Sequence, residues 1–237
     1  MEEIIEERPA SFGYRRGNIF RKYYKYASLA EAEKEAENAR VAHVAGVFCP
    51  RHIEFGYSKE RNMFFNDFQF HNIRKLNVYE LSENDWNEIK HFLSSMPKMS
   101  VNVPFGQTYY FRQMQSALAQ YSSLLSNDLQ ELMSFAGCQI SEKFMHGDFS
   151  LENIGRDLSS GKLILFDFQS SGNGPVGWDW AYMLASCPWQ VAEPLLDDAS
   201  TLPFVKIISA LKYARGIRKN FELELRRENY EHWIQTK

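Results

Sequence analysis

Two short stretches decide the fold: KFMHGDFSLENIG, residues Lys143 to Gly155, and LILFDFQ, residues Leu163 to Gln169. The first stretch places a carboxylate at Asp148 and an amide at Asn153 on one loop beside a short apolar run. A second isolated acid, Asp167, follows Asn153 by fourteen residues, where an apolar run ends. Because the end of a strand is a rigid mount for a side chain, we interpret these three residues as parts of one site.

The chemistry of these side chains suits phosphoryl transfer to an alcohol. Such a reaction needs a held triphosphate, a divalent cation, an aligned nucleophile and an acceptor for its proton. Mg²⁺ prefers hard oxygen ligands and retains several waters, so one carboxylate and one amide oxygen suffice on the protein side. An ordinary Asp has a pKa of about 3.9, so Asp148 would mainly orient the hydroxyl. Asn153 and Asp167 would face the cation.

At this point the sequence resembles a known family. HGDFSLENIG followed by ILFDFQSSGNGPVGWDWA resembles the aminoglycoside phosphotransferase and choline kinase-like group, which shares the protein-kinase fold. The resemblance implies ATP and Mg²⁺ as cofactors, Asp148 as catalytic base, and Asn153 and Asp167 as Mg²⁺ ligands. It also implies that His146 braces the loop and that Asp179 supports the site structurally. The matching positions are His146, Gly147, Asp148, Asn153, Asp167, Gly174, Pro175, Trp178 and Asp179.

The resemblance extends toward the N-terminus with fewer shared residues. NIFRKYYK resembles the strand that carries the ATP-binding lysine, and we choose Lys22 over Lys25. Glu35 is then the expected partner of that lysine on the following helix. The remaining nucleotide-binding candidates are two glycines of a compressed phosphate-covering loop and two residues near the hinge that borders the adenine: Gly13, Gly17, Asn66 and Phe68.

Each of these N-terminal residues also has a structural interpretation. Lys22 could be a solvated strand residue, and Glu35 lies in a run of acids and alanines that is typical of an exposed helix face. Gly13 and Gly17 fit a plain hairpin turn equally well. Gly13 and Gly17 do not make the G-x-G-x-x-G pattern, and no G-x-x-x-x-G-K-[ST] loop occurs in the chain.

The order of expected elements predicts an α+β, bilobal, protein-kinase-like fold. We expect strands over 11–26 and 62–70, a helix over 28–45, and short strands near 144 and over 163–167. A helix is expected from residue 82, with Ser82 as its cap and Asp85 three residues later. Further helices are expected over 108–120, 126–136, 190–197, 203–215 and 221–234. A small strand-rich N-terminal nucleotide-binding lobe would cover 1–68, and a mainly helical catalytic and substrate-binding lobe 69–237. ATP and Mg²⁺ would sit in the cleft between them.

The composition narrows the function classes. The chain has 237 residues and a formal charge of −3, which does not favour nucleic acid as a partner. The three cysteines are far apart and form no C-x-x-C pair, which is typical of reduced thiols in a cytoplasmic protein. Residues 1–10 have no apolar core, so we do not expect them to act as a signal peptide. No apolar run is long enough for a membrane helix.

We therefore expect a small-molecule kinase that transfers the γ-phosphate of ATP to a hydroxyl. The acceptor would be an aminoglycoside-like sugar, another sugar or glycan, or an amino alcohol. One alternative is a pseudokinase-like nucleotide-binding or regulatory protein without catalysis, which the short N-terminal lobe favours. A protein kinase is the other alternative, and Ser150, where protein kinases usually have a lysine, argues against it. The acceptor, the choice between ATP and GTP, and the oligomeric state stay open.

Overall fold

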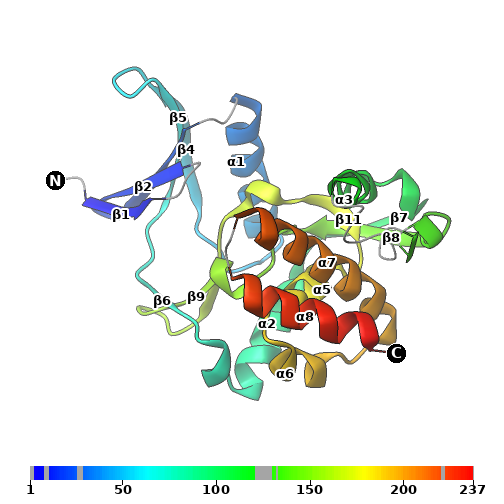
Figure 1. The fold of residues 1–237 in the computed structure, drawn as a ribbon. Coiled ribbons are helices and arrows are strands. Elements are labelled where there is room, and N and C mark those ends of the chain that lie inside the picture. The colour runs from blue at the N-terminus through cyan, green and yellow to red at the C-terminus, as the bar shows by residue number, and fades with distance from the viewer. Residues whose placement is uncertain are drawn as a thin grey trace. The chain divides into compact units, whose positions relative to one another are not determined.

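The computed structural model describes residues 3–7, 11–25, 29–120, 130–131, 133–219 and 222–236 (Figure 1). The chain forms two compact units, each built from two segments. Unit 1 combines Met1–Pro97 with Leu151–Gly172, and unit 2 combines Lys98–Ser150 with Asn173–Lys237. The compact units each combine two separate segments of the chain, whereas the expected lobes, 1–68 and 69–237, are continuous ranges. The lobe boundary after residue 68 therefore stays a prediction.

A five-stranded antiparallel sheet forms the first layer of unit 1. Its order is β1-β2-β3-β5-β4, with β1 (Glu3–Glu7), β2 (Ser11–Arg16), β3 (Ile19–Tyr24), β5 (Met63–Gln69) and β4 (His52–Ser58). The strands β2 and β3 are joined by a two-residue turn in which Gly17 has a φ of 60°. A positive φ at the first turn position favours glycine in hairpins of this length.

Helix α1 (Leu29–Val44) packs on the strands β4 and β5 of this sheet. Its buried face follows helical spacing and consists of small residues plus two polar ones: Ala32, Glu35, Ala36, Asn38, Ala39 and Ala42. The alanines let the helix approach the sheet closely. The two polar side chains therefore need buried partners.

The second part of unit 1 joins its two segments. The sheet order is β10-β9-β6, with β6 (Ile73–Lys75), β9 (Ile154–Asp157) and β10 (Leu163–Leu165). Helix α2 (Glu83–Ser95) begins at the expected cap, where Ser82 and Asp85 form a capping box. The Leu163 N–H donates to Glu88 Oε1 at 2.8 Å. These contacts explain why 73–97 groups with 151–172. The 3₁₀ turns of unit 1 are η1 (Val78–Glu80), η3 (Leu151–Asn153) and η4 (Phe168–Ser170).

Unit 2 contains a small sheet and a group of helices. The sheet order is β11-β8-β7, with β11 (Gly172–Pro175), β8 (Gln139–Met145) and β7 (Lys98–Pro104). Helix α5 (Trp178–Ser186) packs on α7 (Leu202–Lys219), which also packs on α8 (Leu223–Gln235). The remaining elements are η2 (Phe105–Gln107), α3 (Tyr109–Ala119), α6 (Trp189–Ala192), η5 (Glu193–Leu195) and η6 (Ala199–Thr201). Within the described ranges, no helix is both long and apolar enough to cross a lipid bilayer.

The observed elements confirm the α+β class and correct several boundaries. The strands β1, β4, β6, β7, β9 and β11 were not expected, because their sequences are short or lack a clear alternation. The helix expected over 190–197 is a single turn followed by η5, which has a proline in its first turn. Residue 28 and most of 121–132, where parts of two helices were expected, lie outside the described residues.

Candidate active site

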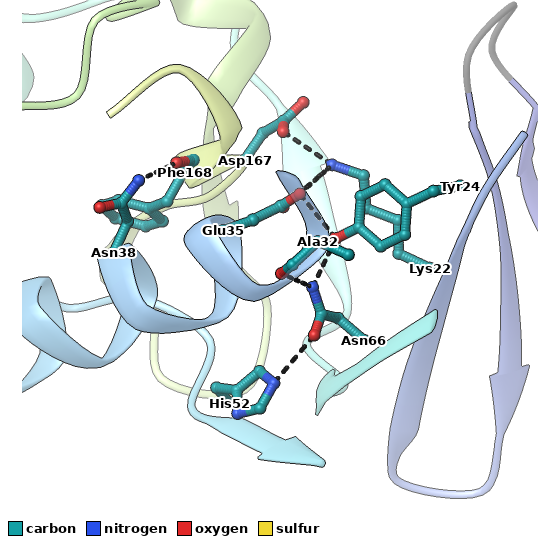
Figure 2. Close-up of polar contacts among 9 residues, drawn as sticks. All are labelled: Lys22, Tyr24, Ala32, Glu35, Asn38, His52, Asn66, Asp167 and Phe168. Carbon is teal, nitrogen blue, oxygen red and sulfur yellow. Dashed lines mark hydrogen bonds and ion pairs between the residues drawn. The ribbon is translucent and has the colours of Figure 1, made fainter. Parts of the chain in front are cut away.

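Lys22 lies in the middle of β3, between Gly13 on β2 and Asn66 on β5. Its ammonium group has three donors, and carboxylate oxygens lie within reach of all three. Lys22 Nζ lies 2.9 Å from each oxygen of Glu35 and 2.8 Å from Asp167 Oδ1 (Figure 2). The structure thus places the expected lysine and glutamate in contact and adds the expected Mg²⁺ ligand to the same cluster.

The Lys22–Glu35 pair is buried. Burial by itself would lower the pKa of Lys22, but the carboxylates of Glu35 and Asp167 outweigh burial and raise that pKa. Burial pulls the pKa of Glu35 upward, and Lys22 opposes this effect. Because one ammonium contacts both oxygens of Glu35, each oxygen accepts a hydrogen bond from it, and neither oxygen needs a proton of its own. We therefore assign an ionised pair at neutral pH.

Asp167 is the second residue after β10 and has a left-handed backbone, with a φ of 67°. This region is uncommon for a residue with a side chain, and Asp is among the residues that enter it most readily. The following turn is tied to α1, since Asn38 Nδ2 donates to the carbonyl groups of Phe168 at 3.1 Å and Ser171 at 3.0 Å. Helix α1 therefore has two links to this segment. Its Glu35 shares the Lys22 ammonium group with Asp167, and its Asn38 holds the turn that follows Asp167.

Asn153 lies beside the segment of Asp167 because of the register between β9 and β10. Ile154 pairs with Leu165, and the Phe166 N–H donates to the Asn153 carbonyl at 3.0 Å. The two segments with the expected metal ligands thus end next to each other at one end of the strand pair. A carboxylate and an amide suit Mg²⁺, and Asp167 already accepts from a cation. The residues fit such an ion.

Among the described residues, no group of three or more His, Cys, Asp or Glu side chains has the arrangement of a metal site. The two expected ligands are Asp167 and Asn153. Only Asp167 is one of these four residue types, because Asn153 carries an amide. The metal role of Asn153 and Asp167 therefore rests on their side-chain chemistry and on their neighbouring positions.

The loop with Asp148 belongs to unit 2 and is held by Asp179. The Oδ2 and Oδ1 atoms of Asp179 accept the backbone N–H groups of His146 at 2.8 Å and Gly147 at 2.9 Å. Gly147 has a φ of 80°, a conformation that glycine adopts without strain. Two buried backbone donors at the start of the loop are thus satisfied by one side chain, which restrains the backbone next to Asp148.

Asp179 itself lies in the first turn of α5 and is buried. Burial raises its pKa, while the electrostatic interaction with His146 and the two backbone hydrogen bonds favour the ionised form. The N-terminal end of a helix also favours a negative charge. His146 is completely buried, and its ring lies edge-on to Phe149. The burial and contacts of Asp179 and His146 are therefore those of residues that support the loop.

The structure gives the other four N-terminal candidates packing or hydrogen-bonding roles. A Cβ at Gly13 would lie 2.2 Å from the ring of Phe20, so glycine is needed there for close packing. Gly17 forms the β2–β3 turn. Asn66 is fully buried and hydrogen-bonded behind Glu35, and Phe68 packs edge-on against His52. Their contact with a nucleotide stays a prediction.

Sequence reasoning missed three residues that support the site: Tyr24, which contacts Glu35, His52, which contacts Asn66, and Asn38, which holds the turn after Asp167. Two of them had a local signal. Tyr24 is two residues after Lys22 and so shares its face of the strand. Asn38 is three residues after Glu35 and so shares its face of the helix. His52 had no such signal, because it reaches the cluster through a partner on another strand.

The candidate residues are divided between the two units. Lys22, Glu35, Asn153 and Asp167 belong to unit 1, while His146, Asp148 and Asp179 belong to unit 2. Within each unit, the structure brings the expected residues together or places them on adjoining segments. The convergence of Asp148 on Asp167 stays a prediction.

Comparison with known proteins agrees with these features. The model of the phosphotransferase enzyme family, APH, matches residues 109–201, which include both motif stretches. No match was found among curated proteins.

Three solved structures illustrate the likeness. A thermostable mutant of aminoglycoside phosphotransferase APH(4)-Ia has a TM-score of 0.72 and 14% identity, over 99% of this chain and 94% of that one. A choline/ethanolamine kinase family protein from Mesorhizobium loti has a TM-score of 0.64 and 13% identity, over 98% and 85%. The amicoumacin kinase hAmiN, solved with AMP-PNP and Ca²⁺, has a TM-score of 0.69 and 13% identity, over 98% and 88%.

At these identities the likeness concerns the fold. The sequence motifs and the family model add independent evidence from the central part of the chain. The chain therefore has the protein-kinase-like fold of aminoglycoside and choline kinases, and its resemblance to that phosphotransferase group is confirmed.

Proposed function

We propose that this protein is an ATP- and Mg²⁺-dependent phosphotransferase that moves the γ-phosphate to a hydroxyl of a small molecule. The observation that supports this most is the contact of Lys22 with both the buried Glu35 and the partly exposed Asp167. In this cluster, Lys22 is the cation that would bind phosphate, Glu35 is the residue that positions Lys22, and Asp167 is the carboxylate that would bind the metal. The adjacent position of Asn153 supplies the second oxygen ligand.

Lys22 binds phosphate oxygens in this proposal. The side chain of Glu35 is only 2% exposed, whereas that of Asp167 is 18% exposed. The contact of Lys22 with Asp167 is therefore the one that a phosphate oxygen and a water-accessible cation can replace, while Glu35 keeps the lysine in place. When bound to Asn153 and Asp167, Mg²⁺ offsets the charge of the phosphate oxygens.

Asp148 acts on the acceptor. It accepts a hydrogen bond from the acceptor hydroxyl and aligns its oxygen with the γ-phosphorus. A bond forms between these two atoms while the bond from that phosphorus to the β–γ bridging oxygen breaks. ADP leaves with that electron pair, and Asp148 receives the proton late in the step, which suits a carboxylate in a loose transition state. Asp179 keeps the backbone of the loop in place.

For the acceptor, we propose an aminoglycoside-like sugar, another sugar or glycan, or an amino alcohol. One of the similar structures is a ternary complex of APH(4)-Ia with ADP and hygromycin B, and another contains a choline/ethanolamine kinase family protein. Both names point to hydroxyl acceptors of small size.

The test is ATP turnover with a panel of such alcohols for wild type, Asp148→Asn and Asp167→Asn. We expect Asp148→Asn to lower kcat by about 100-fold or more while nucleotide still raises the Tm. Asp167→Asn should lose the Mg²⁺-dependent part of that Tm increase. Glu33→Gln, on the exposed side of α1, is the matched control and should behave as wild type.

Two outcomes would go against the proposal. If both Asp variants keep the wild-type rate, the site is elsewhere. If Mg-ATP stabilises the protein but no hydroxyl compound is phosphorylated, the alternative of a nucleotide-binding regulator without catalysis is favoured.

A further inference from the structure

We propose that Tyr24 and Asn66 are positioning residues that hold the Glu35 carboxylate against Lys22 through a one-directional chain of hydrogen bonds starting at His52. The inference rests on the proposed function, since it concerns the lysine that would bind phosphate. The chain is drawn in Figure 2. It runs from β4 through β5 and β3 to helix α1.

The chain is continuous over four side chains. His52 Nε2 lies 3.1 Å from Asn66 Oδ1, and Asn66 Nδ2 lies 2.7 Å from Tyr24 Oη. Tyr24 Oη lies 2.7 Å from Glu35 Oε2. Asn66 Nδ2 also lies 2.9 Å from the carbonyl oxygen of Ala32, which is on the same helix as Glu35.

The chemistry of these groups determines the direction of each bond. A backbone carbonyl can only accept, so the Asn66 atom facing Ala32 must be the NH₂ group. Asn66 Oδ1 is then an acceptor, and His52 must carry its proton on Nε2. Tyr24 accepts from Asn66 and has one proton left, which it donates to the ionised Glu35. Every donor therefore points toward the carboxylate.

Burial keeps the members of the chain in the required protonation states. Asn66 is fully buried, and Tyr24 and Glu35 are 3% and 2% exposed. Burial, followed by the charge of Glu35, raises the pKa of Tyr24, so its hydroxyl stays a donor. Burial lowers the pKa of His52, which favours the neutral ring. His52 Nδ1 has no hydrogen-bond partner among the described residues, as expected for the atom without a proton.

The chain also restrains α1. Ala32 and Glu35 are three residues apart and lie on one face of the helix. Asn66 holds the backbone at the first, and Tyr24 holds the side chain of the second. A movement of α1 that separated Glu35 from Lys22 would thus leave buried polar groups on β3 and β5 without partners, which is costly. The expected hinge residue Asn66 therefore acts through Glu35, behind the nucleotide site.

The test uses Tyr24→Phe, which removes one hydroxyl and keeps the ring. Tyr23→Phe is the matched control, because Tyr23 is equally buried on the same strand and packs against Phe12 on the other face. The first readout needs no nucleotide: hydrogen exchange of the Lys22 ammonium protons, followed by ¹⁵N NMR. We expect about tenfold faster exchange in Tyr24→Phe, the effect of one hydrogen bond to a charged group, and no change in Tyr23→Phe.

The second readout is the Kd for Mg-ATP. Tyr24→Phe should raise it severalfold in the wild-type background and have no effect in a Glu35→Gln background, whereas a merely structural role would give the same effect in both.

The third readout is the ¹⁵N spectrum of His52, which should show the neutral Nε2–H tautomer at pH 7.

These readouts separate the inference from the proposed function. Unchanged Lys22 exchange in Tyr24→Phe, or an Nδ1–H tautomer at His52, overturns the inference whether or not ATP binds. If exchange quickens as expected but neither wild type nor Lys22→Met binds Mg-ATP, the positioning chain stands and the proposed function fails.

Discussion

Burying the charged side chains of Lys22 and Glu35 has a cost in the free energy of folding. Removing two charges from water costs several kcal/mol per ion in a protein interior, and pairing recovers only part of it. Tyr24 and Asp167 contribute further contacts to the same two groups. Apolar residues could fill the same space without that cost. The pair is therefore better explained by a need for a fixed ammonium group than by stability.

This view predicts the stability of two variants. Glu35→Ala leaves a buried ammonium with one partner fewer, so we expect a loss of about 3 kcal/mol in the free energy of unfolding. The double variant Lys22→Met/Glu35→Leu removes both charges and should recover most of that loss. Urea unfolding followed by circular dichroism measures both.

Nucleotide binding should be lost in both variants, which separates stability from function. A double variant that is less stable than Glu35→Ala would contradict the interpretation. It would mean that the ion pair contributes net stability beyond its functional role.

At the scale of elements, the strand pair β9–β10 is the mount for the expected metal ligands. Its open end carries Asn153 and the segment of Asp167, and its closed end is a turn held by Asp157. Asp157 Oδ2 accepts from the hydroxyl groups of Ser159 and Ser160, each at 2.6 Å. A firm turn keeps the register of the two strands, and the register determines which residues adjoin at the other end.

The turn predicts an acid-sensitive contribution to stability. The hydrogen bonds from Ser159 and Ser160 lower the pKa of Asp157 from 3.8 to about 2. A lowered pKa in the folded state stabilises the protein above the unfolded pKa, and this contribution disappears as pH falls from about 4 to about 2. Asp157→Asn should therefore cost about 1–2 kcal/mol at pH 7 and almost nothing near pH 2.

Urea unfolding of wild type and Asp157→Asn between pH 2 and 7 checks this expectation. Glu60→Gln, at an exposed position, serves as the control and should show no pH-dependent difference. A difference for Asp157→Asn that stays constant over the whole range would contradict the role assigned to the carboxylate.

At the scale of the whole molecule, the main feature is that each compact unit contains two distant segments. Residues 151–172 supply β9 and β10 to unit 1, where β9 is the central strand between β10 and β6. Their side chains are buried, with Leu163, Ile164 and Leu165 at 1% exposure or less. The N-terminal segment alone therefore lacks part of its core.

This organisation predicts that a fragment of residues 1–97 does not fold cooperatively. It would expose the apolar face of α2 and the unpaired edge of β6 to water. Joining residues 151–172 to it through a flexible linker should restore a sigmoidal unfolding transition in urea. If the fragment alone unfolds with the same midpoint and slope as the joined form, unit 1 does not depend on its second segment.

The local parts of the site were predictable because they depend on residues close in sequence. The spacing of His146, Asp148 and Asn153 defines one loop, and the likeness of NIFRKYYK to a strand of the family was the basis for preferring Lys22 to Lys25. The capping box at Ser82 was likewise recognised from four residues. Strands such as β6 and β9 were missed, because a short strand gains its stability from neighbours that the local sequence does not reveal.

The sequence by itself determined the motif residues and the α+β class, since both follow from short-range spacing and side-chain chemistry. Only the tertiary structure decided that residues 151–172 join unit 1 and that Asp179 holds the loop of Asp148. It also decided that Asn66 is fully buried and hydrogen-bonded to Tyr24 and to the carbonyl group of Ala32. The reason is physical: these outcomes depend on sheet register and on which polar groups are buried together, and both are set by residues far apart in the chain.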